Sequence, residues 1–153
     1  MVDSNKKEEI GMSFMVKTVT RLTAVVILLF GIYIVLHGHI SPGGGFAGGL
    51  IIALSFVQVM IAFGKDIALR KLSEAKAAVL ESVGGLLFLT IAALGFLGGH
   101  FLINFFASKG RPFTLFSAGT IPFYNIAIAI KVAVGLFSIF IVLVILKRAK
   151  KEE

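Results

Sequence analysis

The chain has 153 residues, of which 58% are hydrophobic and 15% are charged, and its mean hydropathy is +1.00. These values exclude an ordinary soluble domain and place the chain among integral membrane proteins. The sequence contains no cysteine, which excludes a disulfide framework, iron–sulfur ligation and thiolate chemistry in this chain.

Four apolar segments are long enough to cross a bilayer, which takes roughly 20 residues of helix. They are residues 18–36, 46–63, 77–106 and 122–146. The third is long enough to tilt or to project from the membrane. We therefore predict an all-α integral membrane protein, with one membrane domain over residues 1–153, four transmembrane helices, and tails at 1–17 and 147–153. The first segment lacks a small-residue cleavage site, so we expect it to be retained in the protein.

Lysines and arginines are distributed unevenly between the ends of these segments. Twelve lie in the N-terminal flank, in the link between the second and third segments, and in the C-terminal tail, whereas Lys109 and Arg111 alone lie in the link between the third and fourth. The positive-inside rule then predicts that the N and C termini are both cytoplasmic. The formal charge of +7 reflects this topology and needs no nucleic-acid partner. The basic link at 64–81 is expected to be an interfacial helix, and the aromatic link at 107–124 to lie outside.

A glycine-rich turn, HGHISPGGGFAGG at residues 37–49, joins the first two segments. Pro42 ends helical hydrogen bonding, and the glycines after it permit backbone angles that other residues avoid. Glycines four residues apart share a helix face, where another helix approaches closely. Gly95 and Gly99 repeat this spacing in the third segment. We therefore assign an architectural role, as turn and helix-packing residues, to Pro42, Gly43, Gly44, Gly45, Gly48 and Gly49, with direct ion passage as the alternative.

Lys131 is an ionisable residue surrounded by apolar neighbours in IAIAIKVAVGLF. A lysine at the bilayer centre costs roughly 2.5–3.5 kcal/mol on insertion scales. It lies about eight residues into the fourth segment, or ~12 Å along a helix. Two explanations remain open: its amine snorkels to the outer interface, or it belongs to a proton or ion path, because a desolvated lysine loads and releases protons readily.

Glu81 is the one carboxylate that falls within a predicted segment. It is either solvated near the inner face and stabilised by a helix dipole, or a site at the entrance of an ion path. The predicted topology separates Glu81 from Lys131 in depth, so we expect the two not to pair within one copy. Lys131 would then find its partner in another chain, bound water or a polar cavity, which indicates a multisubunit complex.

His37 and His39 flank Gly38 in the turn, with no nearby carboxylate and no cysteine. This is a weak signal for a metal, and we predict no metal site. The histidines either hydrogen-bond the turn or form a proton-accessible outer entrance. His100 is expected to be packed or interfacial. The candidates for ion translocation are Lys131, Glu81, Asn125, His37 and His39.

The turn HGHISPGGGFAGG resembles the signature of the B subunit (MrpB/MnhB family) of Mrp-type multisubunit sodium/proton antiporters, which recurs in membrane-bound hydrogenase and related respiratory complexes. The likeness extends to the basic link, to a third helix with Glu81 and Gly84, and to YNIAIAIKVAVG in the fourth. It implies a non-catalytic subunit of the cell membrane that has no cofactor. Its implied partners are other small Mrp-type membrane subunits, antiporter-like subunits and, in redox-driven complexes, hydrogenase or other redox subunits.

One position departs from this resemblance. Stand-alone bacterial subunits often carry an acidic residue early in the fourth helix, where this chain has Asn125. The departure favours the version within a respiratory complex. The alternatives are a subunit of a stand-alone Mrp antiporter, a purely structural scaffold without ion contact, and a four-helix exporter, which needs a carboxylate that the first segment lacks. No nucleophile–base pair or phosphate cradle is present, so we expect no enzyme.

Overall fold

The structure, a computed structural model, describes residues 12–64, 74–100, 102 and 118–152. Its elements are α1 (Phe14–Leu36), α2 (Gly44–Phe63), α4 (Glu74–Leu94), the short 3₁₀ helix η1 (Gly95–Gly98) and α5 (Ile121–Glu152). Each of the four α-helices is long and apolar enough to cross a membrane, and the described residues include no strand. The prediction of an all-α chain with four membrane-spanning helices is confirmed.

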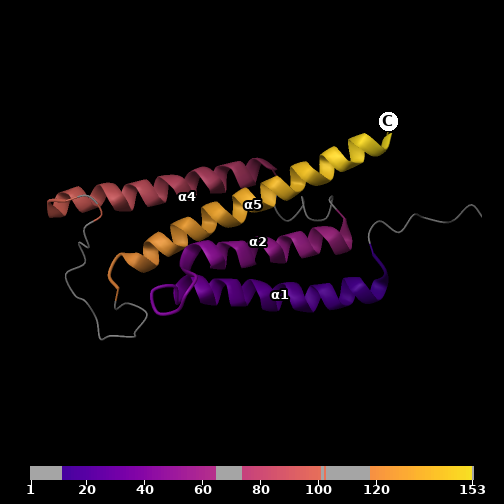
Figure 1. Cartoon of the computed structure of the whole chain (residues 1–153), viewed down its shortest axis with the longest axis horizontal. Helices are drawn as coiled ribbons and strands as arrows, with labels where there is room; N and C mark the ends of the chain where they lie inside the picture. The colour runs from indigo at the N-terminus through magenta and orange to yellow at the C-terminus, as the bar shows by residue number, and fades with distance from the viewer. Residues whose placement is uncertain (1–11, 65–73, 101, 103–117, 153) are drawn as a thin grey trace, which may run out of the picture.

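The four helices lie side by side in the order α1, α2, α5, α4, so the last helix of the chain inserts between the second and the third (Figure 1). The short turn makes α1 and α2 antiparallel. The central helices α2 and α5 are parallel. Gly45 near the start of α2 lies at Asn125 near the start of α5, and farther along both helices the rings of Phe56 and Phe137 have centroids 5.8 Å apart. The core of the chain therefore follows the contact between α2 and α5.

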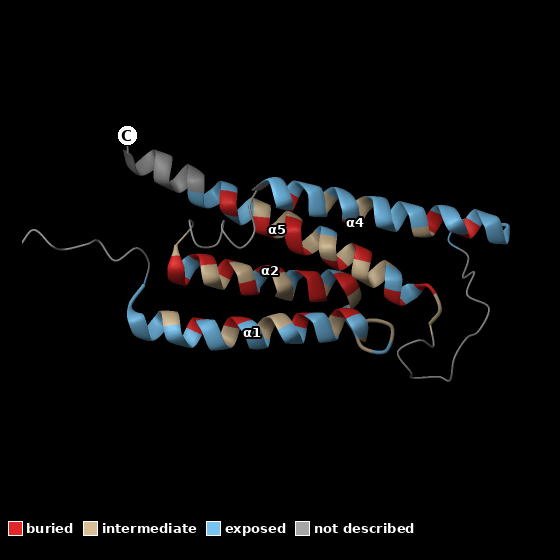
Figure 2. Ribbon diagram, turned by 180° about the vertical axis from the view of Figure 1, so that it is seen from behind, coloured by how far each residue is buried: buried red, intermediate tan, exposed pale blue. Residues whose placement is uncertain are grey.

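Burial is concentrated on the two central helices, whereas α1 and α4 are mostly exposed (Figure 2). Phe137 is wholly buried and packs with Val57, Met60 and Ile141. Large apolar side chains such as Leu22, at 71% exposed, and Leu97, at 85%, point outward instead. An apolar exterior of this extent suits a surface that faces lipid or other membrane helices.

Glycines bring the helix backbones together at both contacts of α2. A Cβ added to Gly48 would strike Val35 of α1, and one added to Gly49 would lie 2.8 Å from the Ala129 carbonyl oxygen of α5. A Cβ on Gly45 would strike the backbone of Asn125. Gly48 thus faces α1, whereas Gly45 and Gly49 face α5.

The third and fourth helices differ from their expected bounds. The third was expected to run to residue 106, but the α-helix ends at Leu94 and gives way to η1. Gly99 has φ of 103° and nothing within 4 Å of an added Cβ, so the expected Gly95–Gly99 packing face is wrong. Part of the expected tail is helical, since α5 continues to Glu152. Half of the expected interfacial helix at 64–81 lies outside the described residues, and its second half is the start of α4. Most of the expected outer link at 107–124 also lies outside them.

The contact between α4 and α5 should be sensitive to one added methyl group at Gly84. An alanine Cβ there would lie 3.1 Å from both the Ala127 carbonyl oxygen and the Lys131 backbone nitrogen. Overpacking of this kind costs about 1–3 kcal/mol. We expect Gly84→Ala to lower the unfolding midpoint of the purified chain in detergent. Gly85→Ala is the matched control, because its Cβ would meet only the Lys131 Nζ at 3.9 Å and alanine favours the helix equally at both positions. Equal midpoints for the two variants would contradict the packing role of Gly84.

Candidate functional site

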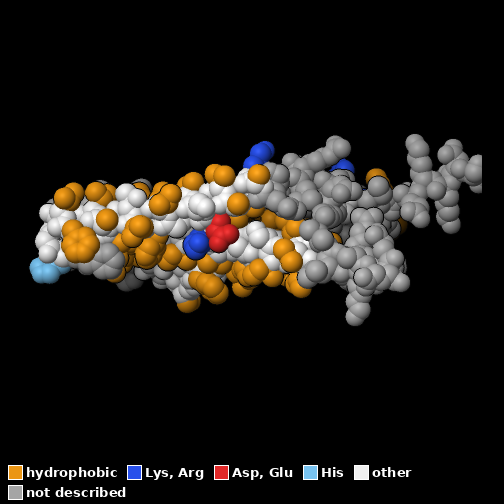
Figure 3. All heavy atoms as spheres, turned by 90° about the horizontal axis from the view of Figure 1, so that it is seen from above, with side chains coloured by type: hydrophobic (Ala, Val, Ile, Leu, Met, Phe, Trp, Pro, Cys, Tyr) orange, Lys and Arg blue, Asp and Glu red, His pale blue; other side chains and the backbone are white. Residues whose placement is uncertain are grey.

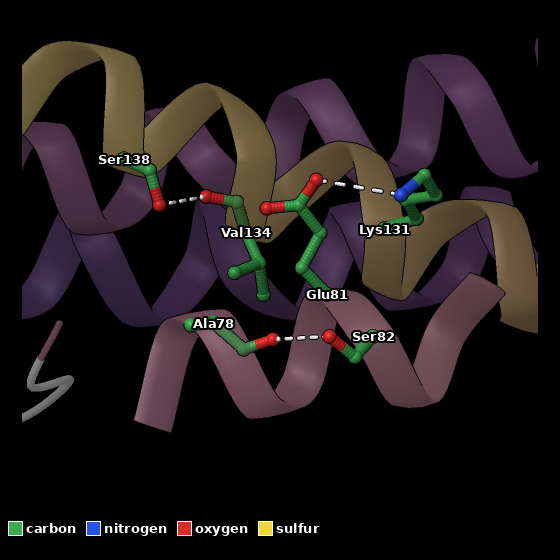
Figure 4. Close-up of polar contacts among 6 residues, drawn as sticks. All are labelled: Ala78, Glu81, Ser82, Lys131, Val134 and Ser138. Atoms are coloured by element: carbon green, nitrogen blue, oxygen red, sulfur yellow. Dashed lines mark hydrogen bonds and ion pairs between the residues drawn. The ribbon is translucent and has the colours of Figure 1, made fainter. Parts of the chain in front are cut away.

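Lys131 of α5 and Glu81 of α4 form an ion pair. The Lys131 Nζ donates a hydrogen bond to the Glu81 Oε1 at 3.3 Å, and the two side chains point toward one another across the helix contact (Figure 4). Both remain partly accessible, with 55% of the lysine and 42% of the glutamate side chain exposed. The expectation that these residues do not pair within one copy is therefore wrong.

The register of α4 against α5 explains the pair. Gly84 lies against the backbone of Ala127 and Lys131, and one turn farther the rings of Phe88 and Tyr124 meet edge to face at 5.1 Å. Glu81 lies nearly one turn before Gly84 on the same helix, so it comes level with Lys131. The expected separation in depth fails because the packing of α4 against α5 sets a register that brings Glu81 level with Lys131.

The pair borders a hollow of about 360 Å³ between α4, α5 and the start of α2. Its other lining is apolar or glycine, including Phe46, Phe88 and Gly135. Seen from the α4 edge, the two charged side chains touch in the middle of a largely hydrophobic surface (Figure 3). Each ion alone would be costly at membrane depth, and pairing offsets part of that cost. Chemically, a proton or a small cation that binds the Glu81 carboxylate would weaken its attraction to the Lys131 ammonium.

Asn125 lies at the other polar position, where α5 begins beside the glycine turn. Its Oδ1 accepts a hydrogen bond from the backbone N–H of Gly45 at 3.3 Å, across 80 residues of sequence. The first N–H groups of a helix lack partners within the helix, and Gly43 supplies no side-chain cap to α2. Asn125 thus caps α2 from another helix. Its Nδ2 and the Tyr124 hydroxyl are buried without a hydrogen-bond partner in the described part of the chain.

The histidines of the turn have local contacts. The Nδ1 of His37 lies 3.0 Å from the Tyr33 carbonyl oxygen, and the two rings stack at 4.1 Å. The Ser41 hydroxyl donates to the His37 carbonyl oxygen at 3.1 Å, which closes the end of α1. His39 follows in the same turn, half-buried, and His100 is exposed after η1. His37 and Asn125 therefore belong to the turn, separate from the ion pair, and the described residues hold no group of three metal-ligating side chains.

Two further polar contacts were not anticipated. The Gln58 Nε2 donates to the Thr23 Oγ1 at 2.7 Å between α2 and α1, and the Arg21 guanidinium lies 5.3 Å from the ring centroid of Phe63. Gln58 was visible as a polar residue in an apolar segment. Its partner could not be read from the sequence, because Thr23 lies 35 residues away on another helix.

The amino-acid sequence matches a known protein family over most of its length. Residues 15–138 match the family described as a domain related to the MnhB subunit of Na+/H+ antiporter. The chain belongs to the MnhB family. Together with the four helices able to span a membrane, this makes it a multi-pass membrane protein. The family description names an antiporter subunit and no enzyme, in agreement with the expected non-catalytic role.

Relatives of this MnhB-family chain include an uncharacterized protein of Methanocaldococcus jannaschii, 38% identical over 85% of this chain and 53% of that protein. The putative antiporter subunit mnhB2 of Staphylococcus saprophyticus is 40% identical over 56% of this chain and 61% of its own length. A chain in the structure of the membrane-bound sulfane sulfur reductase, an archaeal respiratory membrane complex, superposes with a TM-score of 0.69 at 31% identity, over 90% of this chain and 59% of that one. The chain therefore spans less than two thirds of each of these relatives.

Removal of the Asn125 cap should destabilise the turn. Asn125→Ala leaves the Gly45 N–H without its acceptor, and the loss of a helix cap costs about 1 kcal/mol. We expect a lower unfolding midpoint for the purified variant in detergent. Ser138→Ala is the control on the same helix, since the Ser138 hydroxyl bonds only the carbonyl of Val134 one turn away. If both variants unfold like the parent chain, Asn125 does not cap α2.

Proposed function

We propose that this MnhB-family chain is a non-catalytic membrane subunit of a Mrp-type cation/proton antiporter module within a membrane-bound hydrogenase or related respiratory complex. In this proposal the chain helps to couple sodium and proton movement, both termini are cytoplasmic, and its partners are small Mrp-type and antiporter-like subunits together with redox subunits. A chain of the sulfane sulfur reductase complex is similar to 90% of the present chain, which supports membership of a respiratory complex rather than a stand-alone antiporter.

The observation that carries the proposal is the half-exposed Lys131–Glu81 pair amid apolar helix surfaces. Ionisable residues at membrane depth are costly, and where they persist they commonly mark ion and proton pathways. A proton or a sodium ion competes with the Lys131 ammonium for the Glu81 carboxylate. Neutralising the carboxylate releases the ammonium, whose flexible stem then moves its charge along the hollow. Binding of a cation therefore leaves one net positive charge on the previously neutral pair, and movement of the ammonium toward an interface lowers the cost of that charge.

Changes to the pair should alter transport more than assembly. We expect Lys131→Leu and Glu81→Gln each to lower sodium-dependent proton exchange at least tenfold in proteoliposomes that contain the whole complex, because each variant leaves one partner uncompensated. The reversed double variant, Lys131→Glu with Glu81→Lys, should recover part of the exchange, because it restores the attraction.

Lys76→Gln is the control, since it removes a positive charge from α4, the helix that carries Glu81, outside the pair. Subunit content is measured on the same preparations. Single variants that assemble fully and exchange ions at the parent rate would show that the chain is a structural scaffold without ion contact, which the glycine contacts of α2 and α4 also suit.

The parent assembly can be identified by gentle purification of the chain from its native membrane. We expect antiporter-like and small membrane subunits to co-purify together with iron–sulfur or nickel-containing subunits, and mass spectrometry with metal analysis measures both. Recovery of antiporter-like subunits without any redox subunit would assign the chain to a stand-alone antiporter, as the name of the staphylococcal relative suggests. Recovery of the chain alone would contradict the multisubunit proposal.

A further inference from the structure

A second face of the helix layer carries a long apolar groove. α5 directs Lys131 and Gly135 toward the hollow of the ion pair, but Ile130 and Val134 toward a different hollow of about 320 Å³ above α2. A third hollow, of about 560 Å³, lies between α1 and α2 and is lined by Arg21, Val25 and Leu28, among others. Phe56 of α2 lines both of the hollows on this face. The two hollows therefore adjoin at Phe56, and we refer to them together as the groove.

The groove is long and has a charge at one end. Its α1 side runs from Arg21 to Leu36, which is about 22 Å of helix at 1.5 Å per residue. Beyond Arg21 the lining is almost wholly apolar, and the Ser55 hydroxyl is satisfied by the Ile52 carbonyl oxygen at 2.9 Å. The hydrocarbon layer of one bilayer leaflet is about 15 Å deep, which corresponds to about ten residues of helix. Counted from Arg21 along α1, about ten residues reach the position where the lining of the 320 Å³ hollow begins, at Ile32.

Arg21 carries a positive charge without a carboxylate partner in the described part of the chain. Its guanidinium is held over the Phe63 ring, which fixes the group at the mouth of the groove but does not neutralise it. A planar guanidinium is well suited to binding phosphate oxygens through two parallel hydrogen bonds. The expected ligand is therefore amphiphilic, with an anionic head and an apolar tail.

The charge and the lining of the groove favour an amphiphilic lipid. The hollow next to Arg21 is lined by α1 and α2 residues, whereas the hollow beyond Phe56 is also bounded by α5 and by Leu80 of α4. A single hydrocarbon chain is much thinner than a helix with its side chains, which is about 10–12 Å across, and can follow both hollows. We infer that this groove binds a membrane lipid with an anionic phosphate headgroup, with the phosphate at Arg21 and one hydrocarbon chain lying along α2 past Phe56. This site is independent of any ion transport by the Lys131–Glu81 pair.

The site can be tested on the intact complex purified in detergent supplemented with phosphatidylglycerol or phosphatidylcholine. Retained lipid is measured by mass spectrometry and the melting temperature by light scattering. We expect preferential retention of phosphatidylglycerol, with a higher melting temperature. Arg21→Gln should reduce the retention at least fivefold, and Val25→Trp should do the same by filling the groove.

Two controls match these variants. Val26→Trp adds the same bulk at an exposed neighbouring position that does not line the groove, and Lys76→Gln removes a positive charge on α4. Both should retain lipid like the parent complex. Equal retention by Arg21→Gln and the parent would overturn the proposal, as would the same melting shift with inorganic phosphate alone. Loss of a subunit from Val25→Trp, but not from Val26→Trp, would overturn it too, by showing that a protein occupies the groove.

Discussion

The close approach of α5 to both of its neighbours is the constraint on which the rest of the structure depends. Gly45 and Gly49 bring α2 against one side of α5, and Gly84 brings α4 against the other. Helices in a membrane gain little from burying apolar surface, because lipid is equally apolar, so small residues that permit close packing fix where they meet. Those contacts set the order α1, α2, α5, α4 and the register of each pair of helices.

Register, in turn, creates both polar positions of the chain. Sliding α4 by one turn along α5 would move Glu81 about 5.4 Å from its place beside Lys131 and leave two unpaired ions in an apolar surface. A similar slip of α5 along α2 would take Asn125 from the first N–H groups of α2. The Lys131–Glu81 and Asn125–Gly45 hydrogen bonds form only in the register that the glycine contacts permit. They therefore stabilise that register over its alternatives.

The layer exposes two faces of different character. One bears the ion pair beside an apolar hollow. The other bears the groove over α2, with Arg21 at one end. The chain has a large exposed apolar surface and a small core, so lipid or neighbouring membrane helices must cover that surface. This agrees with its membership of a family described as antiporter subunits and with its likeness to a chain of a respiratory membrane complex.

The sequence alone determined the number and kind of helices, because hydropathy and length belong to each segment separately. It also indicated the family, through the glycine turn, and named Lys131, Glu81 and Asn125 as candidate functional residues. Only the tertiary structure decided which partners they have, where α4 ends, and which neighbouring helix each packing glycine approaches. The physical reason is that lateral order and register arise from contacts between residues 50 to 80 positions apart, which the hydropathy of single segments does not contain.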